Sequence, residues 1–173
     1  IYSTGTGVAR DYSRARYYYE IAAKKNYSVA QVKLGYIYFF GKGTDINYEK
    51  ARYYFELASQ HNQSDALCFL GTIYERGYGV KQNYEKARKY YELSAFMQNS
   101  DAFVMLGHFY LYGIGVKKNI KKAVCYYESA AEMNNATALF ALGNILSFNC
   151  CASICVYCPN DLLDIPEAIR CYT

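Results

Sequence analysis

The sequence has little of what catalytic sites and membrane spans require. It contains two histidines, His61 and His108, and neither lies beside a cysteine or serine in a recognisable nucleophile motif. Tryptophan is absent and proline occurs only twice. No apolar run approaches the roughly 18 residues that a membrane-spanning helix needs. We therefore expect no enzymatic centre, no cofactor and no transmembrane segment within this sequence.

A repeat is the dominant feature that is present. Glycine recurs every 36 residues, at Gly35, Gly71, Gly107 and Gly143. A leucine precedes each glycine, and an alanine stands four residues before the leucine. A Gly-x-Gly sequence follows in the first three copies, and three further columns recur: Asp11, Asn47, Asn83 and Asn119; Ala15, Ala51, Ala87 and Ala123; Tyr18, Tyr54, Tyr90 and Tyr126. Each period therefore holds two apolar patterns of helical spacing separated by a glycine turn.

Each period predicts a helical hairpin. The first helix, helix A, is expected to begin at Ser28, Ser64 or Ser100, whose hydroxyl would accept an amide hydrogen of the first turn. The second, helix B, is expected to begin after the Asp or Asn column and to end near Asn26, Asn62 or Asn134. The Gly-x-Gly between them suits positive φ. Because no hairpin can bury its apolar face alone, we expect an all-α fold, an α-solenoid of stacked antiparallel helix pairs in a right-handed superhelix.

The ends of the sequence do not coincide with the ends of a repeat. We expect the second half of a truncated repeat in residues 1–27, repeats in 28–63, 64–99 and 100–135, a repeat start with a Cys-rich insertion in 136–163, and the start of a truncated helix in 164–173. The sequence begins without methionine inside a Gly-x-Gly turn and stops within a predicted helix. We therefore expect a fragment of a longer protein.

The segment from Ala66 to Asn99 resembles the SEL-1-like repeat, a relative of the tetratricopeptide repeat. The resemblance is carried by Leu70-Gly71, Tyr74, Gly77-x-Gly79-Val80, Lys86-Ala87, Tyr90-Tyr91 and Ser94-Ala95, and it recurs in register from Gly5 to about Ser147. Two departures exist. Tyrosine stands where the family usually has tryptophan, and asparagine often replaces the aspartate before helix B. The tetratricopeptide repeat fits less well, because its period is usually 34 and it lacks the Gly-x-Gly.

The resemblance implies a scaffold or adaptor for protein–protein interactions, including roles in endoplasmic-reticulum quality control and signalling. Such repeats also occur fused to kinase domains, so a regulatory or targeting segment of a larger enzyme is the alternative. A third possibility is an enzyme-like, β-lactam-binding protein of the cysteine-rich bacterial kind. It is disfavoured because Cys68 and Cys125 lack the regular cysteine spacing of that group, and we expect both to be small buried thiols.

The charge pattern favours a solvated surface. One column is wholly basic: Arg14, Lys50, Lys86 and Lys122. Arg16, Arg52 and Arg88, however, each stand four residues before a glutamate, so these charges are expected to pair along the helix. The one local basic cluster comprises Lys117, Lys118, Lys121 and Lys122. A solvated face is favoured over a nucleic-acid or lipid site.

The remaining cysteines lie where the sequence departs from the repeat by about nine inserted residues. Cys155 and Cys158, with Cys150 or Cys151 and with Cys171, could supply four thiolates to zinc. An apolar loop of reduced thiols, or an error in the gene model, is favoured over a metal. The odd total of seven cysteines favours a reducing, cytoplasmic compartment, whereas three N-x-Ser/Thr sequences leave the endoplasmic-reticulum lumen as the alternative.

The positions that vary between copies indicate a binding face. Offsets of 4, 7 and 11 from Val29 and its equivalents place these positions on one side of helix A. They are Lys33, Tyr36 and Phe40; Phe69, Thr72 and Arg76; Met105, His108 and Tyr112. We expect a concave groove that binds a partner peptide or helix, with Arg76 pairing to a carboxylate, and little contribution of Phe69 and Tyr112 to helix packing. The alternative is that these side chains merely pack on the next helix B.

Overall fold

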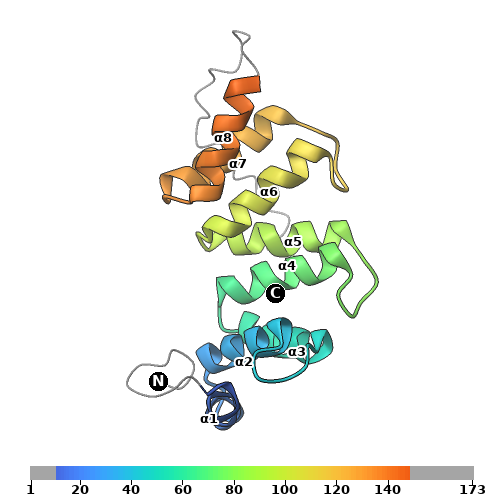
Figure 1. The fold of residues 1–173 in the computed structure, drawn as a ribbon. Helices are drawn as coiled ribbons and strands as arrows, with labels where there is room; N and C mark the ends of the chain where they lie inside the picture. Colours follow the sequence, from blue (N-terminus) through green and yellow to red (C-terminus); the bar gives the residue numbers. More distant parts are fainter. Residues whose placement is uncertain (1–10, 149–173) are drawn as a thin grey trace. The chain divides into compact units, whose positions relative to one another are not determined.

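The computed structural model describes residues 11–148, which form eight α-helices and no strand. The chain divides into two compact units, residues 1–83 and residues 84–173. The first unit contains α1 (Tyr12–Lys24), α2 (Ser28–Phe40), α3 (Tyr48–Ser59) and α4 (Ser64–Arg76). The second contains α5 (Tyr84–Phe96), α6 (Ser100–Tyr112), α7 (Ile120–Glu132) and α8 (Ala136–Phe148) (Figure 1). The even-numbered helices are the predicted A helices and the odd-numbered ones the B helices. The predicted all-α class is confirmed, and the superhelical hand stays a prediction.

A glycine lies where an A helix crosses the B helix that follows it. In the first unit, a Cβ built on Gly35 of α2 would lie 2.4 Å from ring carbon Cε1 of Phe55 on α3. In the second unit, a Cβ on Gly107 of α6 would lie 2.5 Å from Cε1 of Tyr127 on α7. Both rings are fully buried. Any side chain at these glycines would displace the ring, so the repeating glycine is required by the close approach of the two helices.

The Gly-x-Gly sequences end the A helices as predicted. Gly41, Gly77 and Gly113 follow α2, α4 and α6 with φ of 64°, 71° and 72°, the left-handed conformation that glycine adopts at little cost. The amide of the last loop residue then donates to a carbonyl oxygen of the same A helix. This bond recurs at 2.8 Å in all three loops: Asn47 to Tyr38, Asn83 to Tyr74 and Asn119 to Tyr110. The loop conformation is therefore held the same way in each copy.

The B helices begin and end at the predicted polar residues. The side chains of Asp11, Asn47 and Asn119 accept hydrogen bonds from the backbone N–H groups three residues on, at 3.0, 2.9 and 3.1 Å. After the helices, the chain turns through residues with positive φ: Asn26, Asn62, Gln98 and Asn134. Asparagine tolerates this conformation better than most residues, which explains its recurrence at the end of helix B.

The predicted serine caps of the A helices are wrong. Ser28, Ser64 and Ser100 are the first residues inside their helices, and the preceding residues Tyr27 and Gln63 provide no side-chain cap. At α6 the cap is Asn99, whose side chain accepts from the amide of Ala102 at 3.1 Å. A serine one position inside the helix lies beyond the cap geometry, because the cap must have extended backbone angles.

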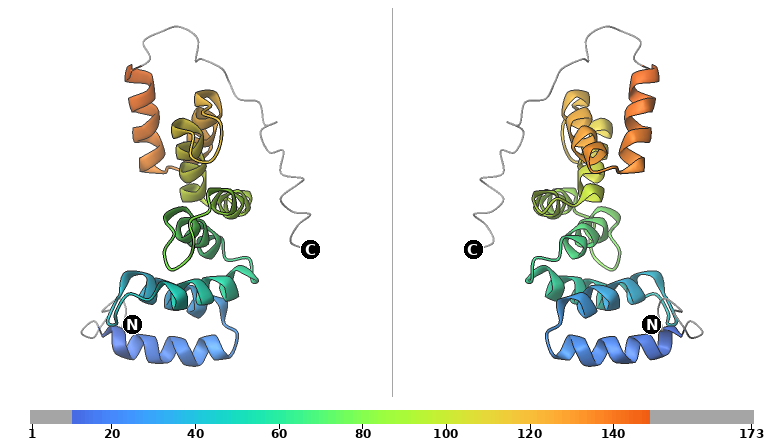
Figure 2. Two further views of the ribbon diagram at one scale, coloured as in Figure 1. Left: turned by 90° about the vertical axis from the view of Figure 1, so that its right-hand side faces the viewer. Right: turned by 90° about the vertical axis from the view of Figure 1, so that its left-hand side faces the viewer.

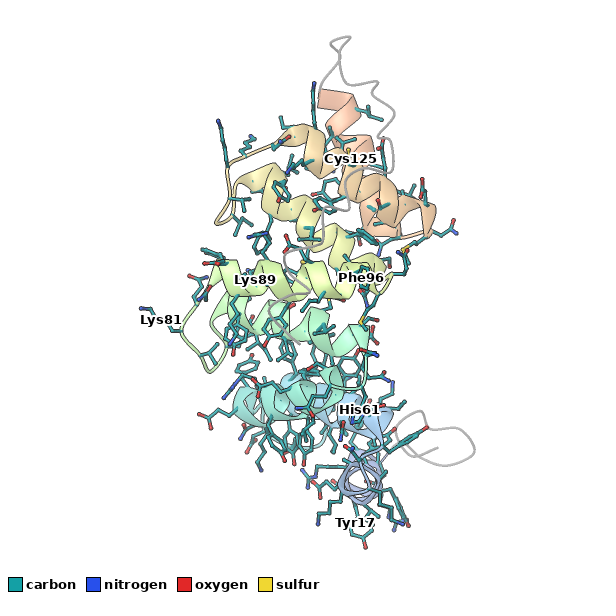
Figure 3. All side chains as sticks on the ribbon, turned by 180° about the vertical axis from the view of Figure 1, so that it is seen from behind. Tyr17, His61, Lys81, Lys89, Phe96 and Cys125 are labelled. Atoms are coloured by element: carbon teal, nitrogen blue, oxygen red, sulfur yellow. The ribbon has the colours of Figure 1, made fainter. Side chains whose placement is uncertain are left out.

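The serine hydroxyls instead connect successive repeats. Gln63 Nε2 donates to Ser28 Oγ at 3.1 Å in the first unit, and Asn135 Nδ2 donates to Ser100 Oγ at 3.1 Å in the second. In the first unit, ring Nε2 of His61, which is labelled in Figure 3, also lies 3.2 Å from Oδ1 of Asn26. His61 thus belongs to a structural contact between the ends of two B helices, and the side chains of one repeat fix the A-helix start of its neighbour.

The leucine of the repeat is buried in α2, α4 and α6. Leu34 and Leu70 are 0% exposed and Leu106 is 1% exposed. The alanines at 30, 66 and 102 are equally buried beside them. Within residues 11–148, no helix is long and apolar enough to cross a membrane.

We expect Leu70→Ala to lower the free energy of unfolding by about 2–5 kcal/mol, because it removes a fully buried side chain and leaves a cavity. Urea unfolding followed by circular dichroism measures the change. Val29→Ala, at a position that is 42% exposed on α2, is the control and should stay within about 0.5 kcal/mol of the parent. A loss below about 1 kcal/mol for Leu70→Ala would show that the side chain is not core.

We expect Tyr127→Phe to stabilise the protein by about 1 kcal/mol. The Tyr127 hydroxyl is buried and has no hydrogen-bond partner within residues 11–148. Burying such a group without a partner is costly, and the equivalent residue of the first unit is already Phe55. Urea unfolding of the two proteins side by side measures the difference, and a clear loss of stability would reveal a partner for the hydroxyl.

Candidate protein-binding face

In the first unit, the predicted face is an aromatic cluster that spans α2 and α4. The Tyr36 ring centroid lies 4.8 Å from that of Phe69 and 6.4 Å from that of Phe40, and the Phe40 and Phe69 centroids are 5.9 Å apart. Phe40 is 51% exposed, whereas Tyr36 and Phe69 are half-buried. The spacing that placed these residues on one face therefore brings them together in space, and Phe40 is the member that presents most of its ring to solvent.

Phe69 also packs between helices, contrary to the expectation. Its ring stacks on that of Phe55, with centroids 5.2 Å apart, and meets the ring of Phe39 at 5.1 Å. Phe55 is the ring that fills the space beside Gly35. Phe69 is therefore part of the contact between α2, α3 and α4. These contacts are made to the preceding helices and not to the next helix B, so the binding role of Phe69 stays a prediction.

Polar groups border the aromatic cluster. The Tyr36 hydroxyl donates to Asp65 Oδ2 at 3.0 Å, which joins α2 to the first turn of α4. Lys33 Nζ lies 5.6 Å from the Tyr36 ring centroid, and Lys42 Nζ lies 5.3 Å from that of Phe40. Cations at these distances are attracted to the ring faces. No pattern in the sequence indicated Lys42, because it is the variable residue of a Gly-x-Gly.

Thr72 and Arg76, the two other predicted residues of the first unit, differ in whether their side chains are available to a partner. The Thr72 hydroxyl donates to the Cys68 backbone carbonyl oxygen at 3.2 Å, so it is engaged with its own helix. Arg76 Nε lies 3.5 Å from Glu75 Oε1, and the Arg76 side chain is 63% exposed. The Glu75 side chain is only 12% exposed, so the arginine is the half of this pair that faces solvent.

In the second unit, the predicted face lies along α6. Tyr112 is 68% exposed, and its ring centroid lies 6.0 Å from that of His108. His108 is half-buried because its ring also meets Tyr127 at 5.7 Å, in an edge-on arrangement. Met105 is half-buried on the same helix. Tyr112 is thus the exposed end of this face, as Phe40 is in the first unit.

The predicted pairing of charges along the B helices is confirmed. Arg16 pairs with Glu20 at 3.8 Å, Arg52 with Glu56 at 2.9 Å, and Arg88 with Glu92. The lysines of the basic column have a role that the sequence did not indicate. Lys50 Nζ lies 5.1 Å from the Tyr38 ring, which stacks on Tyr54 with centroids 5.8 Å apart. The same arrangement joins Lys122, Tyr110 and Tyr126 at 5.3 and 5.5 Å.

An open cavity of about 510 Å³ in the second unit is lined by Arg88, Tyr110, Val116, Lys117, Lys118, Asn119 and Lys122. Two of its cations already have partners. Arg88 forms an ion pair with Glu92, and Lys122 lies over the Tyr110 ring. Lys117 and Lys118 are exposed on the loop. The local basic cluster therefore forms an open, solvated surface.

The cysteines divide into those that the structure describes and those that it does not. Cys68 is a free, buried thiol, as expected. Cys125 on α7 (Figure 3) takes part in a disulfide, so the expectation of a reduced thiol is wrong for this residue. The zinc candidates Cys150, Cys151, Cys155, Cys158 and Cys171 lie outside residues 11–148. Inside that range, no cluster of three or more metal-ligating side chains occurs.

Antiparallel helix pairs that repeat every 36 residues, with a glycine at the helix crossing, define the class of α-solenoid repeat proteins. The chain belongs to the Sel1 repeat family, which matches residues 1–27, 28–63, 64–95 and 100–135. Proteins of this family are generally non-enzymatic scaffolds for protein–protein interactions. A comparison with curated proteins gave no match.

Solved structures of bacterial repeat proteins are similar to this chain. A Sel1 repeat protein from Oxalobacter formigenes is 34% identical with a TM-score of 0.80, over 86% of this chain and 60% of its own. A protective antigen of uropathogenic Escherichia coli with an SLR fold is also 34% identical with a TM-score of 0.80, over 85% of this chain and 32% of its own. The cysteine-rich protein B of Helicobacter pylori is 29% identical with a TM-score of 0.59, over 76% and 95%.

We expect the protein to lose stability as the pH rises above about 10. Burial, followed by the nearby Tyr110, raises the pKa of Tyr126 well above its ordinary value of 10.0. The unfolded chain then releases this proton at a lower pH than the folded chain does. The stabilisation by protonated Tyr126 is complete below the pKa that this residue has in the unfolded chain. It is lost as the pH rises towards the pKa of Tyr126 in the folded chain. Urea midpoints at increasing pH measure the fall, which should be smaller in Tyr126→Phe; an equal fall would contradict this assignment.

Proposed function

We propose that this chain is a non-enzymatic scaffold that binds a peptide or helix of a partner protein on its A helices, along the face predicted to be concave. The observation that carries the proposal is the exposure of Phe40 and Tyr112, at 51% and 68%, at equivalent positions of α2 and α6. Large aromatic side chains bury much apolar area when a partner covers them. They are also enriched among the residues that dominate binding energy at protein interfaces.

The surrounding groups favour a segment with both an apolar anchor and an acidic side chain. In the first unit, an anchor would lie against Phe40 and the partly exposed ring of Tyr36. Lys33 and Arg76 are exposed cations on the same face. An acidic group of the partner would pair with one of them, and with Arg76 it could form two hydrogen bonds at once. Such contacts set orientation more than affinity.

The pairing of charges on the B helices supports a protein partner over a nucleic acid. Arg16, Arg52 and Arg88 are neutralised by glutamates of the same helix. Lys50 and Lys122 interact with tyrosine rings. Binding to a phosphate backbone would need a stripe of available cations, because it is driven by the release of counterions from that backbone.

We expect Phe40→Ala combined with Tyr112→Ala to weaken partner binding by at least about 2 kcal/mol, roughly 30-fold in Kd. Affinity purification with the full-length protein would identify partners, and isothermal titration calorimetry with a purified partner would give the Kd. The helical content should change little, because both side chains are largely exposed. Phe69 is unsuitable for this test, since its replacement would also disturb the contact with Phe55.

Two controls separate the A-helix face from the B helices. Tyr53→Ala removes a tyrosine of α3 that is 57% exposed, which matches Phe40 and Tyr112 in type and exposure. Lys50→Ala combined with Lys86→Ala removes charges of the basic column. Both changes should weaken binding much less than the double replacement. A larger effect of either control would move the binding surface to the B helices and contradict the proposal.

A further inference from the structure

Three asparagines stand in the Asn-x-Ser/Thr sequence that marks an acceptor of N-linked sugar: Asn26, Asn62 and Asn135. Each lies in a turn between a B helix and the A helix that follows it. The sequence pattern does not distinguish the three. The contacts of their side-chain amides do, because a sugar is attached to the amide nitrogen.

The Asn135 amide is fully used by the fold. The side chain is half-buried, and its Nδ2 group donates to Ser100 Oγ at 3.1 Å and to Asp101 Oδ1 at 2.9 Å. Its Oδ1 accepts from the backbone amide of Thr137 at 3.0 Å. An asparagine amide has two N–H groups, and attachment of a sugar leaves only one. A glycan on Asn135 would therefore break one of the bonds that join this turn to α6.

The Asn26 amide also takes part in packing. Its Oδ1 accepts from Gln31 Nε2 at 3.0 Å and lies 3.2 Å from His61 Nε2. Gln31 is 1% exposed, so Asn26 provides the hydrogen bond of a buried side chain. A sugar on Asn26 would have to share the space around this amide with the His61 ring.

Asn62 differs from the other two. It is exposed, and within residues 11–148 its side-chain amide has no hydrogen-bond partner. Its backbone N–H donates to the Ser59 carbonyl oxygen at 3.3 Å, and its φ of 57° belongs to the turn. A sugar can therefore be attached to Nδ2 of Asn62 without the loss of a contact that the fold uses.

The disulfide of Cys125 favours a compartment in which such a sugar is added. Disulfides persist in oxidising compartments, such as the lumen of the endoplasmic reticulum, and are rare in the cytosol. The odd number of cysteines favours a reducing compartment, but an oxidised cysteine on α7 is the more direct observation. The disulfide and the free amide of Asn62 are independent of each other, and both agree with the lumen.

We propose that Asn62 carries an N-linked glycan, which is added in the lumen of the endoplasmic reticulum. In the transfer, Nδ2 of Asn62 attacks C1 of the first sugar of a lipid-diphosphate-linked oligosaccharide. The C1–N bond forms as the C1–O bond to the diphosphate breaks. The lipid diphosphate is the leaving group, and the amide gives up one proton, so the reaction needs no oxidant or reductant.

The glycan would lie away from Phe40, the exposed ring of the proposed binding face. Gln63, which follows Asn62, donates to Ser28 at the start of α2, whereas Phe40 is the last residue of that helix. The two ends of a 13-residue helix are ~20 Å apart. Figure 3 shows His61 of the Asn62 turn and Lys81 of a Gly-x-Gly loop towards opposite edges of the first unit. A glycan and a bound partner can thus be present together.

The test uses the full-length protein from the cells that produce it. Digestion with peptide N-glycosidase in heavy-oxygen water converts a glycosylated asparagine into a labelled aspartate, which mass spectrometry locates. We expect the label at Asn62 and not at Asn26 or Asn135. A protein without label at Asn62 would overturn the proposal. Label at all three asparagines would keep the site but overturn the selection by amide contacts.

Three variants separate loss of the glycan from loss of the fold. Asn62→Gln removes the acceptor, and Gln98 already has a φ of 58° at the equivalent position. Ser64→Ala removes the recognised sequence, and its equivalent in α8 is already Ala136. Ser64→Thr retains that sequence. We expect only Ser64→Thr to keep the increase in electrophoretic mobility on deglycosylation, with unchanged circular dichroism in all three. An increase that persists in Asn62→Gln would assign the glycan to another residue and contradict the proposal.

Discussion

The contact between an aromatic ring and a helix-A glycine is the constraint on which the repeat depends. Phe55 on Gly35 and Tyr127 on Gly107 leave no space for even one methyl group. The close approach lets a single ring fill the volume between two helices, so that small and large residues alternate across the crossing. Packing of this kind gives most of its energy through buried apolar area, and it also fixes where along each helix the crossing occurs. Because this contact fixes the position of helix A against helix B, the other recurring residues of the repeat also keep their positions relative to one another.

A second recurring contact explains the basic column. In both units a lysine, a helix-A tyrosine and a helix-B tyrosine lie one over another, as in Lys50, Tyr38 and Tyr54. The lysine is attracted to the ring face while its charged end remains near solvent. A row of lysines at a 36-residue spacing would suggest a phosphate-binding ridge, but here Lys50 and Lys122 each belong to the packing of their own hairpin, and Lys86 lies over the Tyr90 ring of its own helix. The charge of the column is therefore a consequence of the fold.

The sequence predicted most of what depends on backbone geometry and failed at a one-residue offset and at the reach of one side chain. Helix boundaries, the Gly-x-Gly turns and the Asn caps follow from local rules, and they were predicted with the correct residues. The predicted serine caps were wrong because the cap residue and the first helical residue are neighbours in the sequence. Periodicity cannot decide which of the two a serine is. Phe69 lies beside Tyr36 and Phe40, as the spacing predicts, but its ring also reaches Phe55, so the residue belongs partly to the core. The binding role of the face stays a prediction.

The hydrogen bond from the helix-B cap residue to a helix-A carbonyl allows a chain of this kind to change in length by whole repeats. Because Asn47, Asn83 and Asn119 all bond to the preceding helix at 2.8 Å, one loop can replace another without altering either helix. Duplication or excision of a whole 36-residue cassette therefore preserves every column. Loss of one residue inside a helix would instead rotate everything after it by about 100° around the helix axis and turn the glycine away from its ring. Modular recombination is thus built into the hydrogen bonding of the loop.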